Sequence, residues 1–179
     1  MGSLSAKAHI RATLLILSDK GAAGTREDRS GPALRTWLAQ QQVEVDACEI
    51  LPDEEELIIA YLARTADVSR PDLIITCGGT GVSPRDRTPE ATLKVVERQV
   101  PGLAEAMRLS SAQKYPAALL SRAVVGIRGE TLILNLPGSP RAAVENLAAI
   151  WAAIPHAVAK IQGDPRDCVP DGTPDCSSI

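Results

Sequence analysis

A chain of 179 residues is long enough to form one domain with a substantial buried core. Its net charge of −3, with two Trp, two Tyr and no Phe, argues against nucleic-acid binding, which needs a basic patch and base-stacking side chains. No apolar run reaches the roughly 18 residues of a membrane span and the N-terminus lacks a signal-peptide core, so we expect a cytoplasmic protein with no membrane partner.

Strand patterns alternate with helix patterns along the chain. Short apolar runs predict strands at 12–17, 43–51, 73–77, 124–127 and 131–134. Amphipathic spacing predicts helices at 32–42, 53–68, 89–99, 103–114 and 141–161, the last with a kink at Pro155. The alternation predicts an α/β three-layer sandwich with a mainly parallel central sheet flanked by helices on both faces. We expect a flexible leader at 1–8, a single domain at 9–163 and a C-terminal tail at 164–179.

The segment DLIITCGGTGVSPRDRTPE, residues 72–90, joins a strand to a helix through a glycine loop. The apolar run 73–77 predicts a buried parallel strand, and the glycines of 78–81 allow positive φ and a close ligand approach. Thr88, Pro89 and Glu90 predict an N-cap, a first helical proline and an acid in the first turn. Such a loop at the carboxyl end of a strand suits phosphate, although a tight turn without a ligand is the alternative.

Two common nucleotide-binding fingerprints are absent from the sequence. Counted from Gly79, the third glycine of G-x-G-x-x-G would fall on Pro84, and no Gly-Lys-Ser/Thr occurs, so neither a dehydrogenase nor a P-loop is expected. The four cysteines form no CxxC motif and the two histidines are isolated, which predicts no zinc site. Cys168 and Cys176 lie in the tail, where they could pair.

Several polar residues follow the other predicted strands. Ser18 and Asp19 follow the first strand, Asp53 follows the second, and Pro137-Gly138-Ser139 follows the last. Parallel strands end at one edge of a sheet, so these residues should gather there. Each also has a simpler explanation, since strand ends use hydroxyls and helix first turns use acids. Backbone amides for phosphates and carboxylates for Mg²⁺, without an obvious nucleophile, fit nucleotidyl transfer.

The segment GGTGVSPRDRTPEAT, residues 78–92, is similar to the signature of the MogA/MoaB family of molybdenum-cofactor biosynthesis proteins. The resemblance continues in the family's order through 17–34, 51–54, 100–108, 120–140 and 161–168. Within the family, the chain is most similar to the molybdopterin adenylyltransferases. The resemblance implies a Mg²⁺-dependent transfer of AMP from ATP to the terminal phosphate of molybdopterin, with release of pyrophosphate.

The resemblance also indicates the residues of the site. Asp53 and Asp86 are the expected catalytic and metal-binding residues. The residues expected to bind molybdopterin and ATP are Ser18, Asp19, Gly78, Gly79, Thr80, Gly81, Pro137, Gly138 and Ser139. Second-rank candidates form an Asp-x-Ser-Gly segment, namely Asp28, Ser30 and Gly31.

Some points stay open at this stage. Arg87 stands where the family usually has an apolar residue; it could pair with Asp86 and weaken it as a metal ligand, or point at phosphate or solvent. Arg85, Arg122 and Arg128 could contact anions or be solvated. The alternative function is a non-catalytic pterin-binding or scaffold module of the MoaB type. The resemblance further suggests a homotrimer, with hexamers in some MoaB-type members, and the molybdenum-insertion enzyme of the same pathway as a partner.

Overall fold

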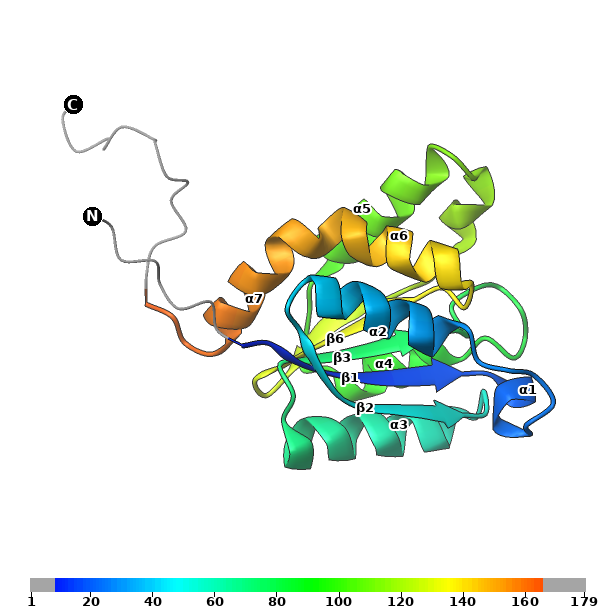
Figure 1. Ribbon diagram of the computed structural model, residues 1–179, viewed down its shortest axis with the longest axis horizontal. Coiled ribbons are helices and arrows are strands. Elements are labelled where there is room, and N and C mark those ends of the chain that lie inside the picture. Colours follow the sequence, from blue (N-terminus) through cyan, green and yellow to red (C-terminus); the bar gives the residue numbers. More distant parts are fainter. Residues whose placement is uncertain (1–8, 166–179) are drawn as a thin grey trace.

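A six-stranded sheet forms the middle layer of the computed structural model, which describes residues 9–165 (Figure 1). The strands are β1 (Arg11–Leu17), β2 (Glu44–Leu51), β3 (Leu73–Cys77), β4 (Arg98–Gln99), β5 (Val125–Arg128) and β6 (Thr131–Leu136). In the order β2-β1-β3-β6-β5-β4, the pairs from β2 to β6 are parallel and the pairs β6–β5 and β5–β4 are antiparallel. The expected mainly parallel sheet is confirmed.

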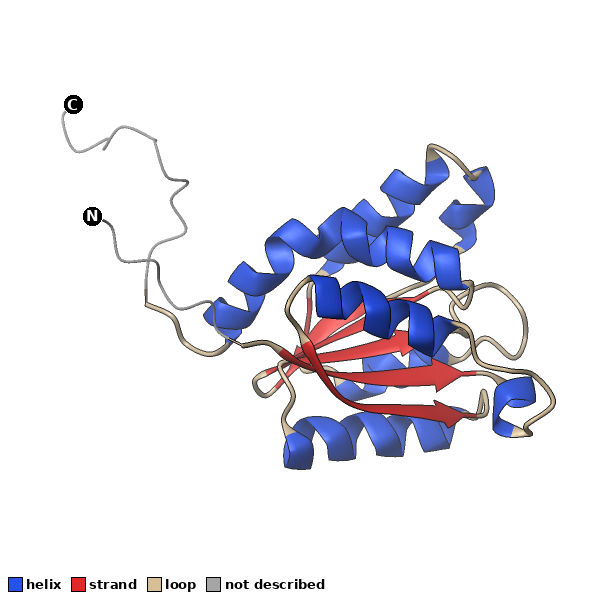
Figure 2. Ribbon diagram, viewed as in Figure 1, coloured by secondary structure: helices blue, strands red, loops and turns tan. Residues whose placement is uncertain are grey.

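Helices cover both faces of this sheet (Figure 2). One face is packed by α2 (Ser30–Gln40), α5 (Pro101–Ala112), α6 (Pro140–Ile150) and α7 (Ile154–Ile161). The other face is packed by α3 (Glu55–Arg64) and α4 (Thr88–Val95). The shorter elements are α1 (Asp19–Ala22), η1 (Thr65–Ser69), η2 (Pro116–Leu120) and η3 (Trp151–Ala153). The three-layer α/β sandwich is therefore confirmed.

Strand β3 shows why a continuous apolar run marks the centre of the sheet. Leu73, Ile75 and Cys77 belong to the apolar cluster beneath α2 and α6, whereas Ile74 belongs to the cluster beneath α3 and α4. All five residues of the strand are buried. A strand covered on both faces buries every side chain, so the usual alternation with exposed polar residues disappears. Its one polar residue, Thr76, is buried with a hydrogen bond from Asn135.

The predicted helix at 89–99 is wrong at its C-terminal end. It ends at Val95, and Arg98–Gln99 instead form β4, paired with β5. The pairing is close, because a Cβ added at Gly126 of β5 would lie 2.8 Å from the carbonyl oxygen of Arg98. Gly126, which pairs with Gln99 and has no side chain, thus allows an edge strand where local periodicity suggested another helical turn.

Other differences lie at helix ends and loops. The loop after β1 contains the short helix α1, whose first turn is capped by Ser18 Oγ accepting from the N–H of Gly21 at 3.1 Å. The predicted long helix at 141–161 is interrupted by η3, since Pro155 has no N–H to donate to the carbonyl of Trp151. Cys168 and Cys176, for which the sequence left pairing open, lie outside the described residues. The division into leader, domain and tail stays a prediction.

The helical run Pro140–Ile161, 22 residues long, has the length and apolar composition that a membrane span needs. In this fold it is a covering helix, because Leu147, Ile150, Ile154 and Val158 pack into the core beneath it. Core helices commonly satisfy the same length and composition criterion, so this run is weak grounds for a membrane span.

Asn135 of β6 is a fully buried polar residue that ties together three elements. Its side-chain amide donates to the hydroxyls of Thr76 and Thr92, each at 2.9 Å, and its carbonyl accepts from the N–H of Val124 at 3.0 Å. Asn135→Ala should lower the free energy of unfolding by roughly 2–4 kcal/mol, because buried partners lose their hydrogen bonds. Urea denaturation checks this against Gln40→Ala, an exposed α2 variant expected to change little; equal stability of the two variants would contradict it.

Candidate active site

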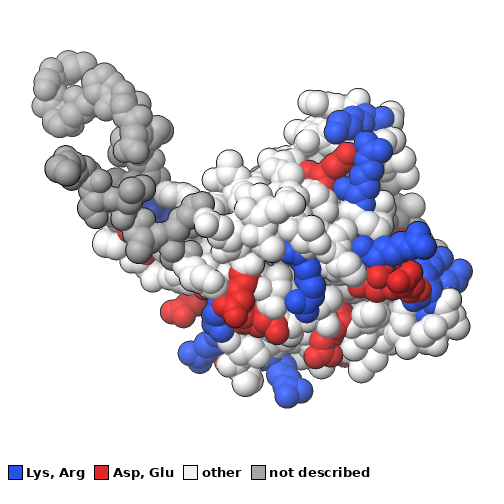
Figure 3. Space-filling model, in the orientation of Figure 1, with Lys and Arg blue, Asp and Glu red and all other residues white. Residues whose placement is uncertain are grey.

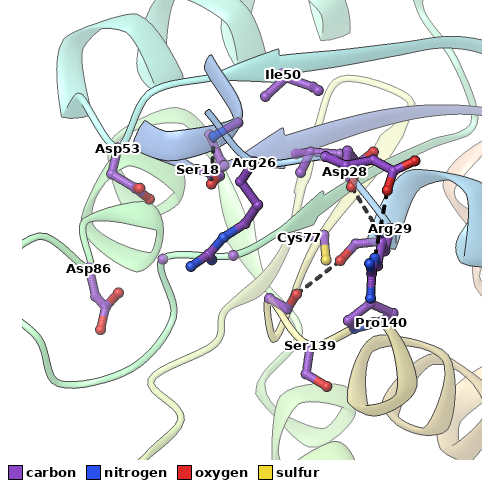
Figure 4. A pocket seen from close by; sticks show the side chains of 18 residues that line it. Ser18, Arg26, Asp28, Arg29, Ile50, Asp53, Cys77, Asp86, Ser139 and Pro140 are labelled. Carbon is purple, nitrogen blue, oxygen red and sulfur yellow. Dashed lines mark hydrogen bonds and ion pairs between the residues drawn. The ribbon is translucent and has the colours of Figure 1, made fainter. Parts of the chain in front are cut away.

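The loops that follow the parallel strands surround a cavity of about 690 Å³ at the carboxyl edge of the sheet (Figure 4). Most of the predicted residues border it, namely Ser18, Asp28, Ser30, Asp53, Gly78, Gly79, Asp86, Gly138 and Ser139. The other predicted residues do not border it, namely Asp19, Gly31, Thr80, Gly81 and Pro137. The expected convergence of strand ends is therefore present.

The glycine loop after β3 is packed too tightly for side chains. Gly78 and Gly79 have φ of +118° and +62°, and a Cβ on Gly78 would lie 2.2 Å from the carbonyl oxygen of Leu17. The loop folds back onto α4, where Thr88 donates its hydroxyl to Gly78 O at 2.8 Å and its N–H to Gly79 O at 3.2 Å. Thr88 is thus the first helical residue, and the prediction that it is the N-cap is wrong; Arg87 holds that position.

Fewer backbone N–H groups of the glycine loop are free to bind phosphate than the sequence predicted. The N–H of Gly78 donates to the carbonyl of Leu136 at 3.0 Å, so it is not free for a ligand, and this part of the prediction is wrong. Within the described residues, the N–H groups of Gly79, Thr80 and Gly81 have no partner. Of these three residues only Gly79 borders the cavity, which makes its amide the best placed for an anion.

Asp53 and Asp86 lie on one side of the cavity, each fixed by its own loop (Figure 4). Asp53 Oδ2 accepts from the N–H of Asp19 at 3.1 Å, and the N–H of Asp53 donates to Asp19 Oδ1 at 3.0 Å. Asp86 Oδ2 accepts from the N–H of Ser83 at 2.8 Å, which closes a small turn. Burial, with the neighbouring charges of Asp19 and Asp86, raises the pKa of Asp53 despite the hydrogen bond from Asp19.

Asp19 is directed away from the cavity by an arginine. Arg85 donates to Asp19 Oδ1 at 2.7 Å and to Asp19 Oδ2 at 3.1 Å, and also to Glu54 at 2.9 Å. These bonds lower the pKa of Asp19. Asp19 therefore joins the loop of Asp86 to the loop of Asp53, and it does not border the ligand space.

The other arginines considered from the sequence have structural partners. Arg122 bonds the carbonyls of Gly81 and Asp86 from behind the loop, each at 2.6 Å. Arg128 lies at the opposite edge of the sheet, where it pairs with Asp67. The described residues contain no ion pair between Arg87 and Asp86.

The second-rank candidates shape the wall opposite the two aspartates. Asp28 accepts from the N–H groups of Ser30 at 2.8 Å and Gly31 at 3.1 Å, which caps the start of α2. Ser30 Oγ donates to the carbonyl of Gly138 at 2.9 Å and so joins α2 to the loop after β6. Within this arrangement Gly31 is a packing residue, because a Cβ there would lie 2.4 Å from Asp28 Oδ2.

Comparison with known proteins identifies the family of the chain that carries this cavity. Residues 13–156 match the family described as a probable molybdopterin binding domain. The chain belongs to this family. Proteins named molybdopterin adenylyltransferase from Helicobacter pylori J99 and Escherichia coli K12 are 42% and 35% identical to it, over 153 and 176 residues. The first alignment covers 84% of this chain and 87% of the relative, and the second covers 90% of each.

Solved structures of the family have the same fold. The molybdopterin biosynthesis enzyme MoaB from Thermus thermophilus is 51% identical, with a TM-score of 0.82, covering 88% of this chain and 99% of that chain. The tungsten cofactor synthesizing protein MoaB from Pyrococcus furiosus is 32% identical, with a TM-score of 0.77, covering 87% and 98%. These two MoaB relatives thus share the fold seen here.

Sequence patterns missed several residues that border the cavity of this molybdopterin-binding domain. Arg26 extends into the cavity between the aspartates and Cys77 (Figure 4), and its guanidinium has no partner among the described residues. A basic residue in a polar loop at a strand end was the available signal. Burial raises the pKa of Cys77 to about 12, and its thiol donates to the carbonyl of Pro137, so it stays neutral and is not a nucleophile.

Acidic and basic side chains gather around the cavity end of the molecule. On the face in Figure 3, both kinds lie close together at the end where α1 and the glycine loop lie. Two carboxylates on one cavity fit Mg²⁺, which takes one or two carboxylates and completes its shell with phosphate oxygens and water. The described residues contain no cluster of three or more His, Cys, Asp or Glu that could hold a metal alone.

The tight packing around Gly79 can be tested by comparison with Gly129, a glycine with a similar positive φ. Gly129 has φ of +53° with open space around it, whereas a Cβ on Gly79 would lie 2.4 Å from Thr88 Oγ1. Gly129→Ala should cost roughly 1–2 kcal/mol of stability from φ strain, and Gly79→Ala roughly 1–3 kcal/mol more from the lost buried hydrogen bond. Chemical denaturation measures both, and equal losses would contradict the proposed packing.

The two neighbouring aspartates should show opposite pH dependence. Asp53 has a raised pKa, so folding is penalised once pH rises above the unfolded pKa near 3.8. Asp53→Asn should therefore stabilise the metal-free protein at pH 7, with a gain that vanishes in acid below that unfolded pKa. Asp19 has a lowered pKa, so Asp19→Asn should destabilise at pH 7, with a loss that shrinks in acid. Unfolding free energies across pH check both signs; pH-independent differences would refute the electrostatic explanation.

Proposed function

We propose that this chain is a molybdopterin adenylyltransferase, which transfers AMP from ATP to the terminal phosphate of molybdopterin and releases pyrophosphate. The observation that carries the proposal is the pair of carboxylates, Asp53 and Asp86, on one side of a cavity that is also bordered by the glycine loop. The relatives of that name at 35–42% identity support the same activity.

The reaction needs charge neutralisation and alignment more than a protein nucleophile. A phosphate oxygen of molybdopterin bonds to the α-phosphorus of ATP while the bond from that phosphorus to the pyrophosphate oxygen breaks. The attacking phosphate is already ionised, so no general base is required. Asp53 and Asp86 would hold Mg²⁺, which neutralises phosphate charge when bound. Without a cation, two carboxylates beside phosphates would only repel them.

The chain's own residues would do the rest by binding and orienting phosphates. The amide of Gly79 and the guanidinium of Arg26 are donors at the cavity that lack partners among the described residues. Ser18 and Ser139 would line the remaining pocket, with Asp28 and Ser30 holding its far wall. This set includes one cation, Arg26, which extends into the cavity between the aspartates and Cys77 and can hold a second phosphate group there.

A second candidate function is a module of the MoaB type that binds pterin without turnover. Relatives named MoaB, at 32–51% identity, are the reason to test turnover directly, although the one from Thermus thermophilus is itself named an enzyme. The two functions differ in whether bound molybdopterin is converted, and the experiment below separates them.

Assembly and cellular location are also part of the proposal. The segment from α5 to η2 carries four apolar side chains that are each more than half exposed, at 53–64%, namely Leu109, Tyr115, Leu119 and Leu120. An exposed apolar group of this kind supports contact between copies, in line with a homotrimer. We place the protein in the cytoplasm, where the molybdenum-insertion enzyme of the same pathway would receive its product.

The decisive test is pyrophosphate release with ATP, Mg²⁺ and freshly prepared molybdopterin. Asp86→Asn should reduce the rate at least about a hundredfold, because it removes a charge from the reacting centre. Asp67→Asn is the matched control, since Asp67 lies at the opposite edge and pairs with Arg128, and it should keep the wild-type rate.

Two results would count against the enzyme. Wild-type protein that binds molybdopterin but releases no pyrophosphate would favour the non-catalytic module. Release that persists in Asp86→Asn would remove Asp86 from the centre of the reaction while leaving the activity itself in place.

A further inference from the structure

We propose that Arg122 is a positioning residue that holds Asp86 at the cavity by fixing the loop at 80–87, and that Arg108 in turn holds Arg122. The inference rests on the proposed function for its catalytic consequence, but the contacts that carry it are independent of that function. It concerns a residue that does not border the cavity.

Arg122 contacts the loop at 80–87 through both its backbone N–H and its guanidinium. Its N–H donates to Thr80 O at 2.9 Å, Nε donates to Gly81 O at 2.6 Å and Nη2 donates to Asp86 O at 2.6 Å. Nη1 pairs with the carboxylate of Glu90 in the first turn of α4. The two ends of the loop are therefore bonded to one guanidinium, and their separation is fixed by its planar geometry.

These contacts also explain why Arg122 does not serve as an anion-binding residue. Each nitrogen of its guanidinium already has a protein acceptor. Moving it toward a phosphate would leave Glu90 without its cation, and Glu90 Oε2 is already buried without a partner. Burial raises the pKa of Glu90, but the hydrogen bond from Arg122 and other nearby charge lower it overall, so the carboxylate stays ionised.

Arg108 fixes the backbone on both sides of Arg122. From α5, its Nη1 donates to the carbonyl of Ala123 at 3.0 Å and to that of Ser121 at 3.4 Å. The order of contacts therefore runs from α5 through Arg108 and Arg122 to the loop that carries Asp86. A displacement of about 1 Å at a reacting centre can cost about a hundredfold in rate, so this support matters for catalysis.

Arg122→Lys tests the geometry, since it keeps a positive charge near Glu90 but removes the planar fork. We expect amide hydrogen exchange in a peptide covering 79–87 to accelerate about tenfold or more, as hydrogen bonds that hold the loop are lost. The kcat for pyrophosphate release should fall about tenfold or more, while KM for ATP changes less than about threefold. Arg108→Met, which keeps the loop contacts themselves, should shift both quantities in the same direction by a smaller factor.

Arg128→Lys is the matched control. Arg128 also bonds a carbonyl, that of Val95 at 3.0 Å, and a carboxylate, that of Asp67 at 2.7 Å, but at the opposite edge of the sheet. It should lower stability to a similar degree without changing exchange at 79–87 or kcat.

The outcomes separate this inference from the proposed function. Unchanged exchange at 79–87 in Arg122→Lys, or a raised KM with unchanged exchange, would overturn it, the latter by making Arg122 a substrate contact. Faster exchange with a wild-type kcat would also overturn it, because a loosened loop would then leave the catalytic position of Asp86 unchanged. Wild-type protein without pyrophosphate release would refute the proposed function, and exchange alone would then decide whether Arg122 holds the loop.

Discussion

The close contact between the ends of β1 and β3 is the constraint on which the site depends. The carbonyl oxygen of Leu17 lies so near the Cα of Gly78 that a Cβ there would meet it at 2.2 Å. With no side chain between them, the two loops meet and the chain can turn at positive φ. This turn lets Thr88 bond Gly78, which starts α4 directly behind the loop. The position of Asp86 at the cavity follows from that turn.

A second feature is an electrostatic balance that favours function over stability. Asp19, Glu54, Asp53 and Asp86 lie around one cavity end, and Arg85 forms ion pairs with Asp19 and Glu54. Burial and the nearby charges of Asp19 and Asp86 raise the pKa of Asp53 and so disfavour its ionised form in the ligand-free protein. A bound cation would offset that cost. Sites that accept such a cost are typical of catalysis and are supported by the surrounding core.

The fold itself does not separate the relatives named MoaB from those named molybdopterin adenylyltransferase. MoaB structures superpose on this chain with TM-scores of 0.77–0.82, and adenylyltransferase relatives align over most of its length. Function therefore depends on which donors and carboxylates reach the cavity. In this chain Arg26 is one such donor, and Arg122 acts indirectly by holding the loop of Asp86.

Sequence alone determined the parallel sheet, the β3 strand and the placement of Asp53 and Asp86, because apolar runs and glycines mark where buried strands end. Only the tertiary structure decided which groups at that edge are free. The Gly78 amide is used by Leu136, and Asp19 is held by Arg85, 66 residues away. Such pairings depend on how the strands and loops pack together, which local patterns of hydrophobicity and turn residues do not encode.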